Sequence, residues 1–179
     1  SDGPLAASGT WYFRRVTRGS APFHAIGSAV VELGEFADVV DALLVDAEAA
    51  AITYRISEAL ISMGTACEIA SERYIDRAGR SDDEQVEALL RERVPFAVRR
   101  LNLVPDYIHG RRFESDSPEA FGLVVRMYKA RNNVVHEGTA YEKLSEGNFA
   151  VTPAVALEFL GASQAAVAWL KALNDERRD

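Results

Sequence analysis

The sequence predicts an all-α protein, a four- to five-helix up-and-down bundle preceded by a short N-terminal β-hairpin or irregular arm. From about residue 35 onward, apolar residues recur at spacings of three and four, the period of a buried helix face. Gly and Pro in this part stand at intervals that suit helix ends. Before residue 34 the chain is richer in aromatic and β-branched residues, which favour strands. We therefore expect an arm, or the remnant of a preceding domain, over 1–34 and a helical domain over 35–179.

The arm is expected to hold two short strands. Trp11–Phe13 and Ala25–Leu33 are rich in aromatic and β-branched residues, and Arg18–Pro22 between them is typical of a turn. The helical pattern that follows is at first too long for one ordinary helix. We expect it to form two helices, near 36–48 and near 50–78.

Ser81 is interpreted as the N-cap of a third helix with an acidic first turn. Pro95 falls inside the apolar pattern of this helix, so we expect it to split the helix into 82–93 and 95–102, before a loop that reaches Ser117. The remaining elements are a helix over 118–137 that ends at Gly138, a polar connection over 139–151 and a last helix over 153–174.

Composition and charge limit the classes of function. The 179 residues are 48% hydrophobic and 26% charged, which is typical of one soluble globular domain. Because the single Cys67 cannot form an internal disulfide, we expect a reducing compartment and a cytoplasmic location. The N-terminus lacks the basic start of a signal peptide, and charges interrupt every apolar run of about 18 residues, so we expect no membrane partner. The net charge of −7 disfavours binding of nucleic acid over the whole surface, but 91–131 carries nine basic and five acidic residues, a local +4.

Common catalytic and cofactor motifs are missing from the sequence. It contains no Gly-rich phosphate loop, no Cys-x-x-Cys, no His-Glu-x-x-His and no Gly-x-Ser-x-Gly. The three histidines are far apart and none has a second ligand at metal-binding spacing. We therefore expect no metal and no cofactor.

The unusual segment of the sequence lies in the helix over 118–137. On a helical wheel, Arg131 and Asn132 both fall within the apolar arc, and His136 lies about 40° from Asn132, one turn further on. A buried Arg needs a partner. Glu68 stands beside the apolar stripe of the long helix, so we expect its carboxylate to hold Arg131 by a forked pair of hydrogen bonds. The same residues could equally form a buried polar network that only fixes the helix register.

Arg131-Asn132-x-x-x-His136, followed by Glu-Gly on the penultimate helix, resembles the Arg-x4–6-His signature of the HEPN superfamily (higher eukaryote and prokaryote nucleotide-binding). The likeness covers about residues 36–175 and includes the segment Ala66–Glu68. It implies a bundle that pairs with a second copy, so that two motifs meet in one cleft. Many members are metal-independent endoribonucleases that cleave single-stranded RNA to 2′,3′-cyclic phosphate ends, in toxin or phage-defence effectors with an antitoxin or a fused sensor or effector domain. Others are catalytically silent modules for dimerisation and for binding nucleotide, RNA or a partner within a larger protein.

The resemblance assigns catalytic roles that suit the chemistry of the residues. His136 would act as general acid and base because histidine titrates near neutral pH, and Arg131 would stabilise the charged phosphorane. Asn132 would orient the phosphate or His136, and Glu68 would support Arg131. On the polar arc near His136, the expected substrate-binding residues are Arg126, Lys129 and Asn133.

Overall fold

The computed structural model describes residues 8–13, 25–30 and 38–175. The chain divides into two units, Ser1–Ala37 and Asp38–Asp179. In the first unit, β1 (Ser8–Phe13) and β2 (Ala25–Val30) pair antiparallel, with Ser8 opposite Val30 and Phe13 opposite Ala25. The strand pair agrees with the expected hairpin, while the expected turn at Arg18–Pro22 lies outside the described residues.

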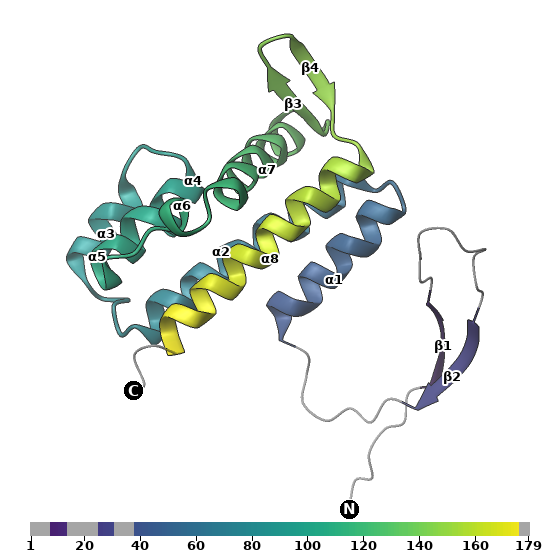
Figure 1. The fold of residues 1–179 in the computed structure, drawn as a ribbon, viewed down its shortest axis with the longest axis horizontal. Helices are drawn as coiled ribbons and strands as arrows, with labels where there is room; N and C mark the ends of the chain where they lie inside the picture. Colours follow the sequence, from purple (N-terminus) through teal and green to yellow (C-terminus); the bar gives the residue numbers. More distant parts are fainter. Residues whose placement is uncertain (1–7, 14–24, 31–37, 176–179) are drawn as a thin grey trace, which may run out of the picture. The chain divides into compact units, whose positions relative to one another are not determined.

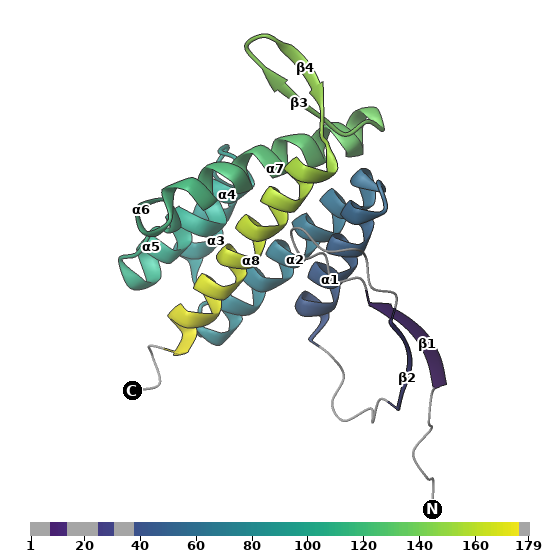
Figure 2. The same cartoon turned by 45° about the vertical axis from the view of Figure 1, so that its right-hand side comes forward.

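The second unit is a helical bundle, which confirms the all-α class. Its long helices are α1 (Val39–Ile52), α2 (Ile56–Arg77), α7 (Pro118–Glu137) and α8 (Pro153–Asp175). α2 packs against α1, α7 and α8, and α8 also contacts α1 and α7 (Figures 1 and 2). The core therefore lies between these helices, and α2 is shared by every part of it.

The boundary between the first two helices lies further along the chain than the sequence predicts. The Ala-rich segment around residue 50 continues α1 instead of ending it, because alanine has the highest helix propensity. The chain turns at Thr53 and Tyr54: the Thr53 hydroxyl donates to the carbonyl of Ala49 at 2.7 Å, and Tyr54 adopts a φ of 62°. The predicted end of the first helix at residue 48 is therefore wrong by one turn.

The third helical block differs from the prediction at both ends. Asp83, not Ser81, caps α3, because its carboxylate accepts from the backbone N–H groups of Gln85 and Val86. The helix that follows Pro95 continues well beyond residue 102 through a π-helical segment, whose wider turns accommodate Pro105. These elements are α3 (Glu84–Arg91), α4 (Phe96–Val98), η1 (Arg99–Leu103), α5 (Val104–His109) and α6 (Phe113–Asp116).

α7 has the predicted bounds, and Gly138 ends it with a φ of 72°. The expected polar connection after it contains an antiparallel hairpin, β3 (Tyr141–Leu144) and β4 (Gly147–Ala150). The hairpin projects from the end of the bundle where α7 ends and α8 begins (Figure 1).

By length and composition alone, α8 is apolar enough to cross a membrane. The expectation from interrupting charges was therefore too strict for this helix. In the bundle, however, α8 contacts α1, α2 and α7, and its residues Phe159, Leu160 and Leu170 are buried. In the bundle, its apolar side chains thus form part of the core.

Candidate functional site

The candidate site lies where α7 crosses α2 and α4. The buried residues of α7 recur at spacings of three and four, as expected for a helix that faces a core. This spacing fixes which residues of α7 face the core and which remain accessible. The buried residues are Phe121, Val124, Met127, Tyr128, Ala130 and Val134.

Arg131 lies across α2 at Gly64. A Cβ atom at Gly64 would stand 3.1 Å from Arg131 Nε and 3.3 Å from its Cδ, so the glycine provides the room for this side chain. Arg131 Nη2 lies 3.2 Å from Glu68 Oε1 and 3.5 Å from Oε2. The predicted pair is present, but one nitrogen faces both oxygens, so the contact is not a fork. Arg131 Nε is buried and has no hydrogen-bond partner among the described residues.

Tyr128 links α7 to α2 next to the contact between Arg131 and Gly64. Its hydroxyl donates to the carbonyl of Gly64 at 3.0 Å, and its ring lies 4.6 Å from that of Phe96. Burial raises the pKa of Tyr128 well above its usual value, so the phenol stays protonated and remains a donor. The Arg100 guanidinium covers Phe96 at 5.5 Å and pairs with Glu72 at 2.5 Å. The floor of the site is thus fixed by aromatic packing and by bonds to α2.

A groove of about 440 Å³ opens above this floor, between α2, α7 and the segment that leads into α4. Its size is within the range of small-ligand sites. One wall is apolar and includes Pro95 and Phe96. The lining as a whole carries three cationic side chains and one carboxylate, a local excess of two positive charges. The polar lining consists of Glu68, Arg99, Lys129, Arg131 and Asn132.

Asn132 and His136 are both exposed, which corrects the expectation that Asn132 points into the apolar arc. The buried residues of α7 centre on the side that faces α2 and α8, so Asn132 falls at the edge of the contact. Val135, which falls in the same apolar arc of the helical wheel, is 59% exposed. Asn132 lines the groove, whereas His136 does not. Within one chain, the structure therefore brings Arg131, Asn132 and Glu68 together and leaves His136 outside.

The hairpin binds two of the three residues expected to contact substrate. Arg126 donates to both carboxylate oxygens of Glu142, through Nε at 2.8 Å and Nη2 at 2.9 Å, and this pair raises the pKa of Arg126. Asn133 Nδ2 donates to the carbonyl of Tyr141 at 2.9 Å. Lys129 is exposed and lines the groove. Only Lys129 of the three is therefore presented to a ligand.

Sequence reasoning missed Gly64 and Phe96 as parts of the site. Gly64 interrupts a strongly helical stretch, and a glycine at such a position can mark a close approach of another group. Phe96 follows Pro95, and nothing in its spacing indicates that its ring would meet Tyr128. Both residues gain their roles from contacts between distant segments.

Comparisons of the chain with protein-family models, with curated proteins and with solved structures found no match. Among the described residues, no group of three or more His, Cys, Asp and Glu side chains is placed to hold a metal ion. The arrangement offers an incompletely bonded guanidinium, an amide and an ammonium group beside an apolar wall. These groups suit an anionic ligand with an apolar or aromatic part.

Proposed function

We propose that this protein is a HEPN-like, metal-independent endoribonuclease that cleaves single-stranded RNA. The observation that carries the proposal is the Arg131 guanidinium. It is held over Gly64, bonded to Glu68 through one nitrogen only, and presented in a groove with Asn132, one helical turn from the exposed His136. Fixed positive charge beside a titratable imidazole is what phosphodiester cleavage by side chains requires.

In the proposed reaction, His136 takes the proton from a ribose 2′-hydroxyl, and the 2′-oxygen attacks the adjacent phosphorus. The bond from phosphorus to the 5′-oxygen breaks, and a second imidazole protonates that oxygen. The products are a 2′,3′-cyclic phosphate and a 5′-hydroxyl. Arg131 stabilises the extra negative charge on the phosphorane, and Asn132 orients the phosphate.

Glu68 has a positioning role in this proposal. Its carboxylate lies on one side of the guanidinium at 3.2 Å, so Arg131 is oriented before the substrate arrives. Such preorganisation lowers the cost of ordering a long side chain in the transition state. Lys129 lines the same groove and would attract the RNA strand.

A second copy of the chain would complete the site. Within one chain His136 stays outside the groove, and the exposed strip Asn132, Val135 and His136 has no cover among the described residues. Pairing two such strips would bring each His136 toward the Arg131 of the other copy and would bury Val135. The active form is therefore proposed to be a homodimer. As a cytoplasmic toxin or phage-defence effector, it would be restrained by an antitoxin or by a fused sensor or effector domain.

A second candidate is a catalytically silent HEPN-like module that dimerises and binds nucleotide, RNA or a partner within a larger protein. The Glu68 carboxylate favours it, because it already neutralises part of the Arg131 charge. Under this alternative, the groove binds a ligand without breaking a bond.

The test is incubation of the purified protein with labelled single-stranded RNA in EDTA. The wild type is compared with His136→Ala, Arg131→Ala and the control Arg91→Ala, which removes an exposed cation from α3. The proposal predicts cleavage to cyclic phosphate ends, reduced about 10² to 10⁴-fold in the first two variants and unchanged in the control. Equal cleavage in all four proteins, or none in any, would reject the nuclease. Binding of RNA without cleavage would support the silent module.

A further inference from the structure

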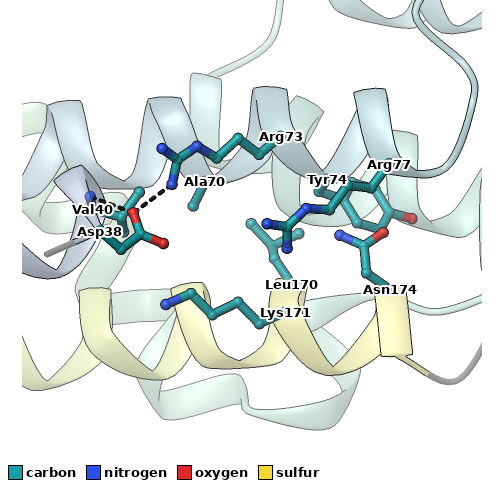
Figure 3. Close-up of a pocket in the computed structure, with 9 residues that line it drawn as sticks. All are labelled: Asp38, Val40, Ala70, Arg73, Tyr74, Arg77, Leu170, Lys171 and Asn174. Atoms are coloured by element: carbon teal, nitrogen blue, oxygen red, sulfur yellow. Dashed lines mark hydrogen bonds and ion pairs between the residues drawn. The ribbon is translucent and has the colours of Figure 1, made fainter. Parts of the chain in front are cut away.

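A small cavity lies between the C-terminal halves of α2 and α8, beside the start of α1 (Figure 3). Arg73 and Arg77 line it from α2, and Lys171 and Asn174 line it from α8. Five and nine residues beyond Glu68, the two arginines fall on the opposite face of α2 from that carboxylate. The cavity is therefore separate from the groove at Arg131.

The charged groups around this cavity are only partly paired. Asp38 caps α1 by accepting from the Val40 N–H at 2.9 Å, and it also pairs with Arg73. These two contacts lower the pKa of Asp38, with the bond from Val40 as the larger cause. Lys171 Nζ lies 2.9 Å from Asp41 on α1. Arg77 makes no hydrogen bond or ion pair within the described part of the chain, and Figure 3 shows its guanidinium turned toward Leu170 and Asn174.

The lining carries more positive charge than its own carboxylate balances. Three cations, Arg73, Arg77 and Lys171, face one anion of the lining, Asp38. Asp41 pairs with Lys171 from α1, so the five groups sum to three minus two, or +1, and the unpaired charge is that of Arg77. Arg73 and Arg77 are also four residues apart on one helix, a spacing at which like charges repel. A bound anion would pair with Arg77 and relieve the repulsion.

We propose that this cavity binds a phosphate monoester group. Such a group carries a charge of about −1.5 to −2 at neutral pH, so it can pair with Arg77 and share Arg73 and Lys171 with their carboxylates. Guanidinium groups recognise its oxygens by paired hydrogen bonds, and the Asn174 amide is a further donor. The enclosed space is about 20 Å³, enough for one water molecule. One phosphate oxygen would therefore enter the cavity, while the remainder of the group lies at its mouth between the exposed Arg77 side chain and the half-exposed Lys171 side chain.

The phosphate could belong to a small molecule or to the 5′ end of a nucleic acid strand, because the cavity contacts the phosphate alone. In either case the site does not depend on the proposed cleavage, since it lies on the other face of α2. Loss of this binding would leave the nuclease proposal unaffected.

The test is calorimetric titration with inorganic phosphate at constant ionic strength, with chloride as the reference. The wild type is expected to bind, and Arg77→Gln combined with Lys171→Gln is expected to bind about tenfold more weakly. Arg91→Gln serves as the matched control and should bind like the wild type. Circular dichroism checks that the double variant is folded, and Asn174→Ala provides a second variant that changes no charge and should also weaken binding.

A second arm identifies the source of the phosphate. A short 2′-deoxy oligonucleotide with a 5′-phosphate is compared with the same strand ending in a 5′-hydroxyl, because neither offers a 2′-hydroxyl for attack. Tighter binding of the phosphorylated strand, lost in the double variant, assigns the site to a strand end. Equal binding of the two strands, with phosphate still bound, assigns it to small molecules. No binding of phosphate, or equal affinity in the wild type and the double variant, would overturn the proposal.

Discussion

Two arginines on different sides of α7 differ in how completely they are paired. On the hairpin side, Arg126 donates through two nitrogens to the two oxygens of Glu142, at 2.8 and 2.9 Å. On the groove side, one nitrogen of Arg131 lies 3.2 and 3.5 Å from the oxygens of Glu68, and its Nε has no partner among the described residues. The first arginine is held by a two-nitrogen contact to its own chain, whereas the second retains more capacity to bind an anion.

The contrast between the two arginines shows how one helix can combine stability with function. Glu142 is 8% exposed, so its pair with Arg126 holds β3 against α7. Arg131 is positioned by the space that Gly64 leaves on α2 and by its contact with Glu68, which is longer than the contact between Arg126 and Glu142. Arginine thus serves stability at one position and is available to a ligand at the other, and the number of its hydrogen bonds distinguishes the two roles.

The largest expected effect comes from filling the space at Gly64. In Gly64→Leu, the new side chain must occupy the volume of Arg131, whose Nε would already stand 3.1 Å from the Cβ. We expect cleavage to fall at least about 100-fold and the free energy of unfolding to drop by about 1–3 kcal/mol from overpacking. RNA cleavage and urea denaturation measure the two effects. In Gly122→Leu on α7, where a Cβ meets nothing within 4 Å, both quantities should stay near wild type, and an equal loss there would contradict the explanation.

A smaller effect is expected on the hairpin side. Glu142→Ala leaves the Arg126 guanidinium over the Phe159 ring without its carboxylate. Because Arg126 is itself 41% exposed, we expect a loss of about 1–2 kcal/mol, between the values for exposed and buried pairs. Denaturation curves provide the measurement. Glu87→Ala, which removes the partner of the exposed Arg91, should cost about 0.5 kcal/mol or less; a comparable cost in both variants would show that the hairpin pair is no stronger than a surface one.

The smallest effect concerns Cys67, the core-facing neighbour of Glu68 on α2. Burial raises the pKa of this thiol from 9.0 to about 12. The unfolded chain therefore ionises first, so the contribution to stability is fully present below about pH 9 and is lost as the pH rises toward 12. We expect the free energy of unfolding to fall by about 1 kcal/mol between pH 8 and pH 10 through this group. Comparison with Cys67→Ala isolates it, and identical pH profiles of the two proteins would show that the thiol is not excluded from water.

Much of the fold could be predicted because its signals are local. Pro118 and Gly138 bound α7 as expected, since proline suits the first turn of a helix and glycine the left-handed position after the last. The partner of Arg131 could also be predicted, because a buried charge on one apolar stripe needs an opposite charge on a facing one.

The remainder depends on contacts that the sequence pattern does not contain. A helical wheel treats an apolar arc as evenly covered, so it could not show that Asn132 and Val135 lie at an edge that the neighbouring helices leave exposed. The π-helical segment before Pro105 and the β3–β4 hairpin are also adjustments to tertiary packing. For the same reason, the sequence does not show that Arg126 pairs with Glu142 instead of facing a ligand, because this pair depends on the position of the hairpin.

The most direct measurement is the RNA cleavage rate in EDTA of Arg131→Gln beside Arg126→Gln, with the melting temperature of each. If the groove side carries function and the hairpin side carries stability, Arg131→Gln loses at least about 100-fold in rate at an unchanged melting temperature. Arg126→Gln then keeps its rate and melts several degrees lower, as expected for a loss of about 1 kcal/mol. Full activity in Arg131→Gln, or loss of activity in Arg126→Gln alone, would contradict the account.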